Sequence, residues 1–170
     1  MFLNYIKEFF VKKSLNVNLN NEKSEVFTKN VQTIGLLIDE STFENSEALI
    51  KELTIHGIAL ENIKVVAYKE KFKEKDTYFR PTFGKKHLNW KGEITEVFLN
   101  EFVNLEFDLL LSYYDVENIF LMFITSKSKA KFKVGFSAVD QNLNRLMINT
   151  GLGNYKLFIS ELFRYLKNIK

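Results

Sequence analysis

The sequence contains no cysteine, a single proline and only seven glycines in 170 residues. Without cysteine, neither a disulfide framework nor a thiolate metal site can form. No apolar run reaches the roughly 18 residues needed to cross a bilayer. The first residues, MFLNYIKEFFVKK, place lysines after the apolar positions and lack a small-residue cleavage site, unlike a secretory signal. We therefore expect a protein of the reducing cytoplasm, and its seventeen phenylalanines indicate a dense core.

Positive charge is concentrated in one part of the chain. The whole chain has a net charge of +3, yet residues 64–91 hold nine basic and three acidic residues, an excess of six. Such asymmetry is typical of surfaces that meet phosphate-rich partners. The same pattern also fits a solvated hairpin whose charges only keep it soluble.

Composition divides the chain near residue 25. Residues 1–25 read as an N-terminal amphipathic helix followed by an Asn-rich linker, and residues 26–170 as a single α/β domain. The helix could dock on the domain, on a partner or on a membrane surface. We expect docking on the domain, because an isolated amphipathic helix of this length is marginal in water.

Short apolar runs alternate with helical patterns along residues 26–170. The expected strands are 31–40, 62–70, 107–114, 131–137 and 145–150, with a further strand near Tyr78 and Phe79. The expected helices are 48–55, ending at Gly57, then 95–104, 116–126 and 154–168. This alternation predicts an α/β fold with three Rossmann-like layers, in which a mostly parallel sheet carries helices on both faces.

Polar side chains follow the expected strands where ligands bind in open parallel sheets. We select Asp39 after the first strand, and Ser112 and Asp115 around the end of the 107–114 strand. Asp39 and Asp115 could converge on Mg²⁺, which prefers carboxylates. The favoured interpretation is that both cap the helices that follow them, so we expect no metal site.

Aromatic and basic residues are mixed in the stretch YFRPTFGKKHLNWKG, residues 78–92. Arg80 and Trp90, with Phe79 and Phe83, offer the charge and stacking surfaces that single-stranded nucleic acid binding needs. The alternative is that the aromatic rings lie under a long loop while the charges stay solvated.

Four lysines occupy every second position from Lys127 to Lys133. Lys127, Lys129 and Lys131 are candidate phosphate contacts, but a strand buried on both faces would not tolerate them. We expect Lys127 and Lys129 to precede the strand, near the end of a helix. GLGNYK, residues 151–156, lacks the third glycine of a dinucleotide fingerprint. No Walker A or zinc-ligand pattern occurs, so we expect no cofactor and no catalysis.

The stretches IGLLIDES, FDLLLSYYDVEN, SKAKFKVGF and MINT resemble an uncharacterised family of short bacterial proteins, known only as a domain of unknown function. This likeness covers most of the chain and implies no activity. Residues 107–136 are also similar to the N-terminal domain of heptosyltransferase-like glycosyltransferases, whose R-x-G-F strand reads Lys133-Val134-Gly135-Phe136 here. Those enzymes place the sugar nucleotide in a second domain, for which 170 residues leave no room. That resemblance therefore implies a binding module.

Three functions follow as expectations. The first is a non-catalytic interaction module whose partner is another protein. The second is an accessory factor that binds RNA or phosphate through residues 64–91 and 127–133, provided that they share one face. The third is an enzyme related to glycosyltransferases with its site at the carboxyl ends of the strands. We favour the first, because a charge of +3 is low for a dedicated nucleic-acid binder.

Overall fold

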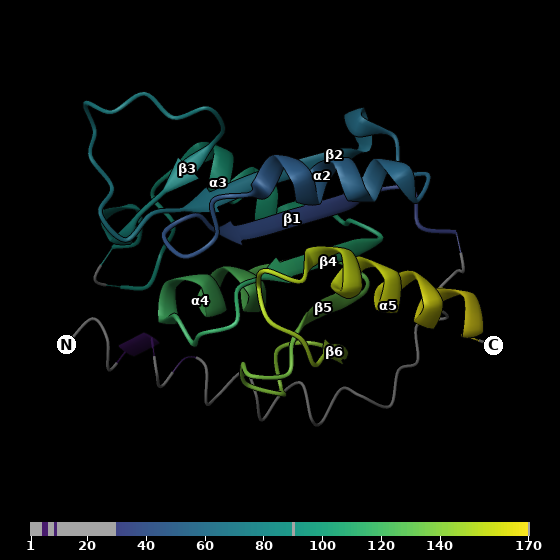
Figure 1. Ribbon diagram of the computed structural model, residues 1–170. Helices are drawn as coiled ribbons and strands as arrows, with labels where there is room; N and C mark the ends of the chain where they lie inside the picture. Colours follow the sequence, from purple (N-terminus) through teal and green to yellow (C-terminus); the bar gives the residue numbers. More distant parts are fainter. Residues whose placement is uncertain (1–4, 7–8, 10–29, 90, 170) are drawn as a thin grey trace.

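The computed structural model describes residues 5–6, 9, 30–89 and 91–169, and in this part of the chain six strands form one sheet. All neighbouring strands are parallel, and their order is β3-β2-β1-β4-β5-β6 (Figure 1). The strands are β1 (Ile34–Asp39), β2 (Ile63–Tyr68), β3 (Thr82–Phe83), β4 (Leu109–Tyr113), β5 (Lys133–Phe136) and β6 (Leu146–Ile148). This is the strand order of the dinucleotide-binding Rossmann fold, so the predicted fold class is confirmed.

Helices cover both faces of the sheet and give three layers (Figure 1). The helices are α2 (Ser46–Ile55), α3 (Val97–Asn104), α4 (Ile119–Lys127) and α5 (Tyr155–Asn168), with short 3₁₀ turns η1 (Leu60–Asn62) and η2 (Lys85–His87). The pair α2 and α5 packs on one face, and the pair α3 and α4 on the other. Successive β1 side chains point to opposite faces of the sheet and contribute to a hydrophobic core on each. Leu36 and Ile38 face α2 and α5, whereas Leu37 faces α3 and α4.

Local sequence explains where these elements end. Every residue of β1 is buried, as expected of a short apolar run in the centre of a parallel sheet. The chain leaves α2 through Gly57, whose φ of 95° lies in the left-handed region that favours glycine after a helix. None of the helices in the described residues is long and apolar enough to cross a membrane.

Three described residues of the N-terminal segment have helical backbone and pack on the domain. Ile6 is completely buried in the core beneath α3 and α4. The Phe9 ring lies 5.3 Å from the Phe123 ring of α4, measured between centroids. These contacts favour docking on the domain, as predicted. The expected division at residue 25 falls outside the described residues.

The strand expected near Tyr78 and Phe79 is wrong. Only after Pro81 does the chain run beside β2, where the Ala67 N–H donates to the Pro81 carbonyl at 3.0 Å and the Lys69 N–H to the Phe83 carbonyl at 2.9 Å. Residues 69–81 instead form a long connection, here called the β2–β3 loop, beyond the carboxyl end of β2 (Figure 1).

Candidate functional site

The carboxyl ends of β1 and β4 form the topological switch point, since α2 leaves β1 toward one face and α4 leaves β4 toward the other. In open α/β sheets this is where nucleotides bind. Here the Phe43 ring packs on Tyr113, with centroids 4.8 Å apart. The Tyr113 hydroxyl donates to the Leu152 carbonyl at 2.6 Å. Aromatic side chains therefore fill the position of a nucleotide crevice.

The connection between β1 and α2 is acidic and contains no glycine. Asp39 is buried and accepts the Ser41 N–H at 2.9 Å, and burial raises the pKa of this carboxyl group despite that hydrogen bond. Glu40 and Glu44 follow it. Phosphate binding needs close backbone approach and favourable charge, and this connection offers neither.

Neither aspartate caps a helix as predicted. Asp39 closes the turn directly after β1, and α2 begins only at Ser46 after Asn45. Asp115 is half-buried ahead of α4, whose cap is Asn118; its side chain accepts the Phe120 and Leu121 N–H groups at 3.0 and 3.4 Å. Both residue types can cap, and the longer turn places Asn118 at the helix start. The described residues also contain no group of three His, Asp or Glu placed for a metal ion.

Ser112 lies inside the core and not at the edge of the sheet. Its hydroxyl is 3.0 Å from the Thr125 hydroxyl of α4, which in turn is 2.8 Å from the Tyr114 hydroxyl. All three side chains are buried. Their hydrogen bonds satisfy polar groups between β4 and α4, so we assign Ser112 a structural role.

The β2–β3 loop presents a single aromatic ring to solvent. Phe79 is 90% exposed, the highest value among the large hydrophobic residues that the structure describes. Scattered surface apolar residues are common, but a nearly fully exposed phenylalanine on an ordered loop marks a candidate contact point.

Both neighbours of Phe79 are held in place. Arg80 forms ion pairs with Glu40, at 3.0 Å from Nε, and with Glu47 at the start of α2. The Tyr78 hydroxyl accepts the Lys73 N–H at 2.9 Å and donates to the Lys73 carbonyl at 3.2 Å. The loop therefore presents Phe79 in a fixed place, which lowers the entropy lost on binding.

The other aromatic residues of the predicted stacking surface do not join Phe79. Phe83 belongs to β3 and is completely buried against Tyr68, with ring centroids 5.2 Å apart. Trp90 lies outside the described residues. Arg80 is engaged with two carboxylates, so within the described residues the predicted nucleic-acid surface is reduced to Phe79 and nearby lysines.

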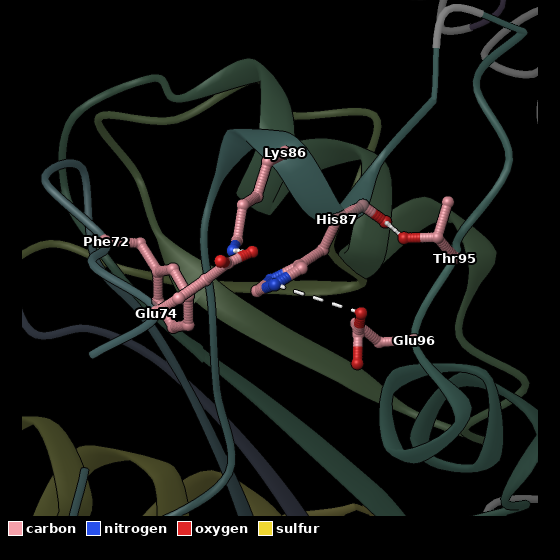
Figure 2. A pocket seen from close by; sticks show the side chains of 6 residues that line it. All are labelled: Phe72, Glu74, Lys86, His87, Thr95 and Glu96. Carbon is pink, nitrogen blue, oxygen red and sulfur yellow. Dashed lines mark hydrogen bonds and ion pairs between the residues drawn. The ribbon is translucent and has the colours of Figure 1, made fainter. Parts of the chain in front are cut away.

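A pocket of about 340 Å³ opens behind the β2–β3 loop. It is lined by Phe72, Glu74, Lys86, His87, Thr95 and Glu96 (Figure 2). The Lys86 ammonium pairs with Glu74 and lies 4.9 Å from the Phe72 ring centroid. The His87 ring lies between this pair and the Glu96 carboxylate, whose Oε1 is 3.9 Å from His87 Nε2 (Figure 2).

His87 is neutral in this pocket. Its Nδ1 accepts the Gly84 N–H at 3.1 Å, which places the ring proton on Nε2, toward Glu96. Burial lowers the pKa of the imidazole below its ordinary value. The sequence did not reveal Glu96 as a partner of His87. The residues between the two form an irregular segment with no periodic pattern, so their approach could not be predicted.

The lysines at 127–133 do not form one face. Lys127 ends α4 and lies 4.5 Å from the Phe9 ring centroid, and Lys129 is exposed in the turn that follows. Lys131 pairs with Asp108 at 2.9 Å. Burial of Asp108 opposes ionisation, but Lys131 and two backbone N–H groups lower its pKa to about 2. Lys133 reaches back to the end of α4, where its Nζ donates to the Thr125 carbonyl at 2.8 Å.

The two basic segments flank opposite ends of the parallel strands. Lys69 and the β2–β3 loop follow the carboxyl end of β2, whereas Lys131 precedes the amino end of β5. Carboxylates also pair with several cations of the first segment, including Lys85 with Glu70 and Lys86 with Glu74. The arrangement thus gives no support to a shared face for RNA, which stays an untested prediction.

A family model described as "Family of unknown function (DUF6913)" matches residues 7–169. No curated protein and no solved structure matches the chain. The resemblance to a family of unknown function is thereby confirmed. The resemblance of residues 107–136 to heptosyltransferase-like glycosyltransferases gains no support.

Proposed function

The chain belongs to this family of unknown function, and we propose that it is a non-catalytic cytoplasmic binding module that contacts another protein through the β2–β3 loop. The observation that carries this proposal is the 90% exposure of Phe79 between anchored neighbours. A phenylalanine that enters a partner's pocket buries roughly 150–250 Å², which is enough to dominate a small interface.

Two further features support a binding role over nucleotide chemistry. Phe43 and Tyr113 fill the switch point, and three carboxylates stand where a phosphate loop would lie. The cytoplasmic assignment rests on the lack of cysteine.

Affinity capture from the native cell tests the proposal with two matched variants. Phe79→Ser removes the proposed anchor, and Leu60→Ser removes a 62% exposed leucine near the amino end of β2, at the opposite edge of the sheet. We expect Leu60→Ser to capture as much partner as the wild type. Phe79→Ser should capture at least about tenfold less, the effect expected for a hot-spot side chain.

Salt and nuclease separate this proposal from RNA binding. Contacts to phosphate weaken steeply with salt, so a protein partner should survive both nuclease treatment and raised salt. Capture that vanishes with nuclease, or that is equal in the two variants, would overturn the proposed function.

A further inference from the structure

The pocket behind the β2–β3 loop carries an unbalanced negative charge. Its lining contains one lysine and two glutamates, and His87 is neutral because its Nδ1 accepts the Gly84 N–H and so carries no proton. One net negative charge therefore remains. The pocket would repel an anionic ligand, whereas a ligand with one positive charge would neutralise its net charge.

One carboxylate of the pocket, that of Glu96, has no lysine or arginine partner among the described residues. Glu96 lies within 4 Å of no lysine or arginine in the described part of the chain, and its distance to the neutral His87 ring, 3.9 Å, exceeds a hydrogen bond. Its side chain is 40% exposed, so it can meet a guest without a costly rearrangement.

The protein itself shows how a cation is held here. The Lys86 ammonium lies over the Phe72 ring and beside the Glu74 carboxylate. The Phe72 ring is also held by Tyr78, which stacks on it with centroids 4.8 Å apart and an interplanar angle of 16°, and by the His87 ring, which meets it edge-on at 4.6 Å. An aromatic face beside a carboxylate is a recognition element for ammonium and guanidinium groups.

We propose that the pocket binds a monovalent organic cation, a guanidinium or primary ammonium group, which displaces Lys86 from Phe72 and Glu74 and pairs with Glu96. Displacement costs little, because the Lys86–Glu74 pair is exposed and such surface pairs contribute little stability. Lys86 thus acts as an internal competitor. The proposal uses side chains other than Phe79 and stands independently of the proposed function.

Titration followed by NMR tests the proposal on the full chain. The probes are Nα-acetyl-arginine N-methylamide and its neutral isostere, Nα-acetyl-citrulline N-methylamide, with n-propylguanidine as a free small-molecule cation of the same single charge. Shifts of the His87 ring and of the backbone amides of residues 84–87 report on the pocket. We expect the two cations to give saturable shifts and the citrulline probe to give none. Stronger binding of the arginine probe indicates a partner side chain, and stronger binding of n-propylguanidine a free small molecule.

Three variants sharpen the test. Glu96→Gln should weaken binding about fivefold or more, and Lys86→Met should tighten it by about two- to fivefold, the worth of an exposed ion pair, because the internal competitor is gone. Glu101→Gln removes an exposed charge of α3 outside the pocket and should leave binding unchanged. The proposal fails if the citrulline probe binds equally, if Lys86→Met does not tighten binding, or if neither wild type nor Lys86→Met shows saturable shifts at these amides.

Discussion

At the scale of single residues, Asp39 is the clearest case of a side chain whose charge opposes folding. It is buried at the end of β1, and burial and the charge of Glu70 raise its pKa even though its carboxylate accepts the Ser41 N–H. Ionised carboxylates in such places are often kept for function.

We expect Asp39→Asn to raise the free energy of unfolding at pH 7, because the amide keeps the acceptor for Ser41 and loses the buried charge. The folded-state pKa of Asp39 lies above the unfolded value of 3.8. The free energies of unfolding of the wild type and of Asp39→Asn should therefore converge as the pH falls through the raised pKa toward 3.8. Urea unfolding at several pH values measures this difference, with the exposed Asp76→Asn as control. A less stable Asp39→Asn protein at pH 7 would show that the charge is favourable in the fold.

Residue types alone could not separate the aromatic side chains of the β2–β3 region. Phe79 and Phe83 stand four positions apart in the same basic stretch, yet one is exposed and the other completely buried. Whether each ring is exposed or buried depends on where the chain begins to pair with β2. Backbone hydrogen bonds from Pro81 onward fix that point. The His87–Glu96 contact was missed for the same reason.

At the scale of elements, α4 shows how the lysine pattern should be interpreted. Lys133 from β5 donates to the Thr125 carbonyl at 2.8 Å, in the last turn of α4, where a cation also complements the helix dipole. The sequence predicted that Lys127 and Lys129 precede the strand, near the end of a helix, and α4 does end at Lys127, six residues before β5 begins at Lys133.

We expect Lys133→Met to lower the free energy of unfolding by about 1–2 kcal/mol, since it removes a charged hydrogen bond to a helix end. Lys129→Met should change it by less than about 0.5 kcal/mol, because that side chain is exposed in a turn. Thermal or urea unfolding compares the two. Equal losses in both variants would contradict a stabilising role for the Lys133 hydrogen bond to the Thr125 carbonyl.

At the scale of the whole molecule, the alternation of apolar runs and helical patterns was enough to predict the layers and the parallel sheet. A buried strand such as β1 can be predicted because its sequence is apolar up to its last residue. The strand order, and with it the filled switch point, depends on contacts such as Phe43 with Tyr113 that link distant segments. No local pattern encodes these contacts.

The two edges of the sheet differ in character. The amino edge carries structural contacts of Lys131 with Asp108 and of Lys133 with α4. The carboxyl edge carries Phe79 and the pocket around His87. We propose that the carboxyl edge contacts another protein through Phe79.

Site-specific photo-crosslinking in the native cell tests this proposed contact of Phe79. A p-benzoylphenylalanine replaces Phe79 in one protein and Leu60 in a second, so that the same reactive group samples each edge of the sheet. We expect a discrete, nuclease-resistant crosslink to another protein from position 79 and none from position 60. Identical products from both positions, or products from position 79 that nuclease removes, would contradict it.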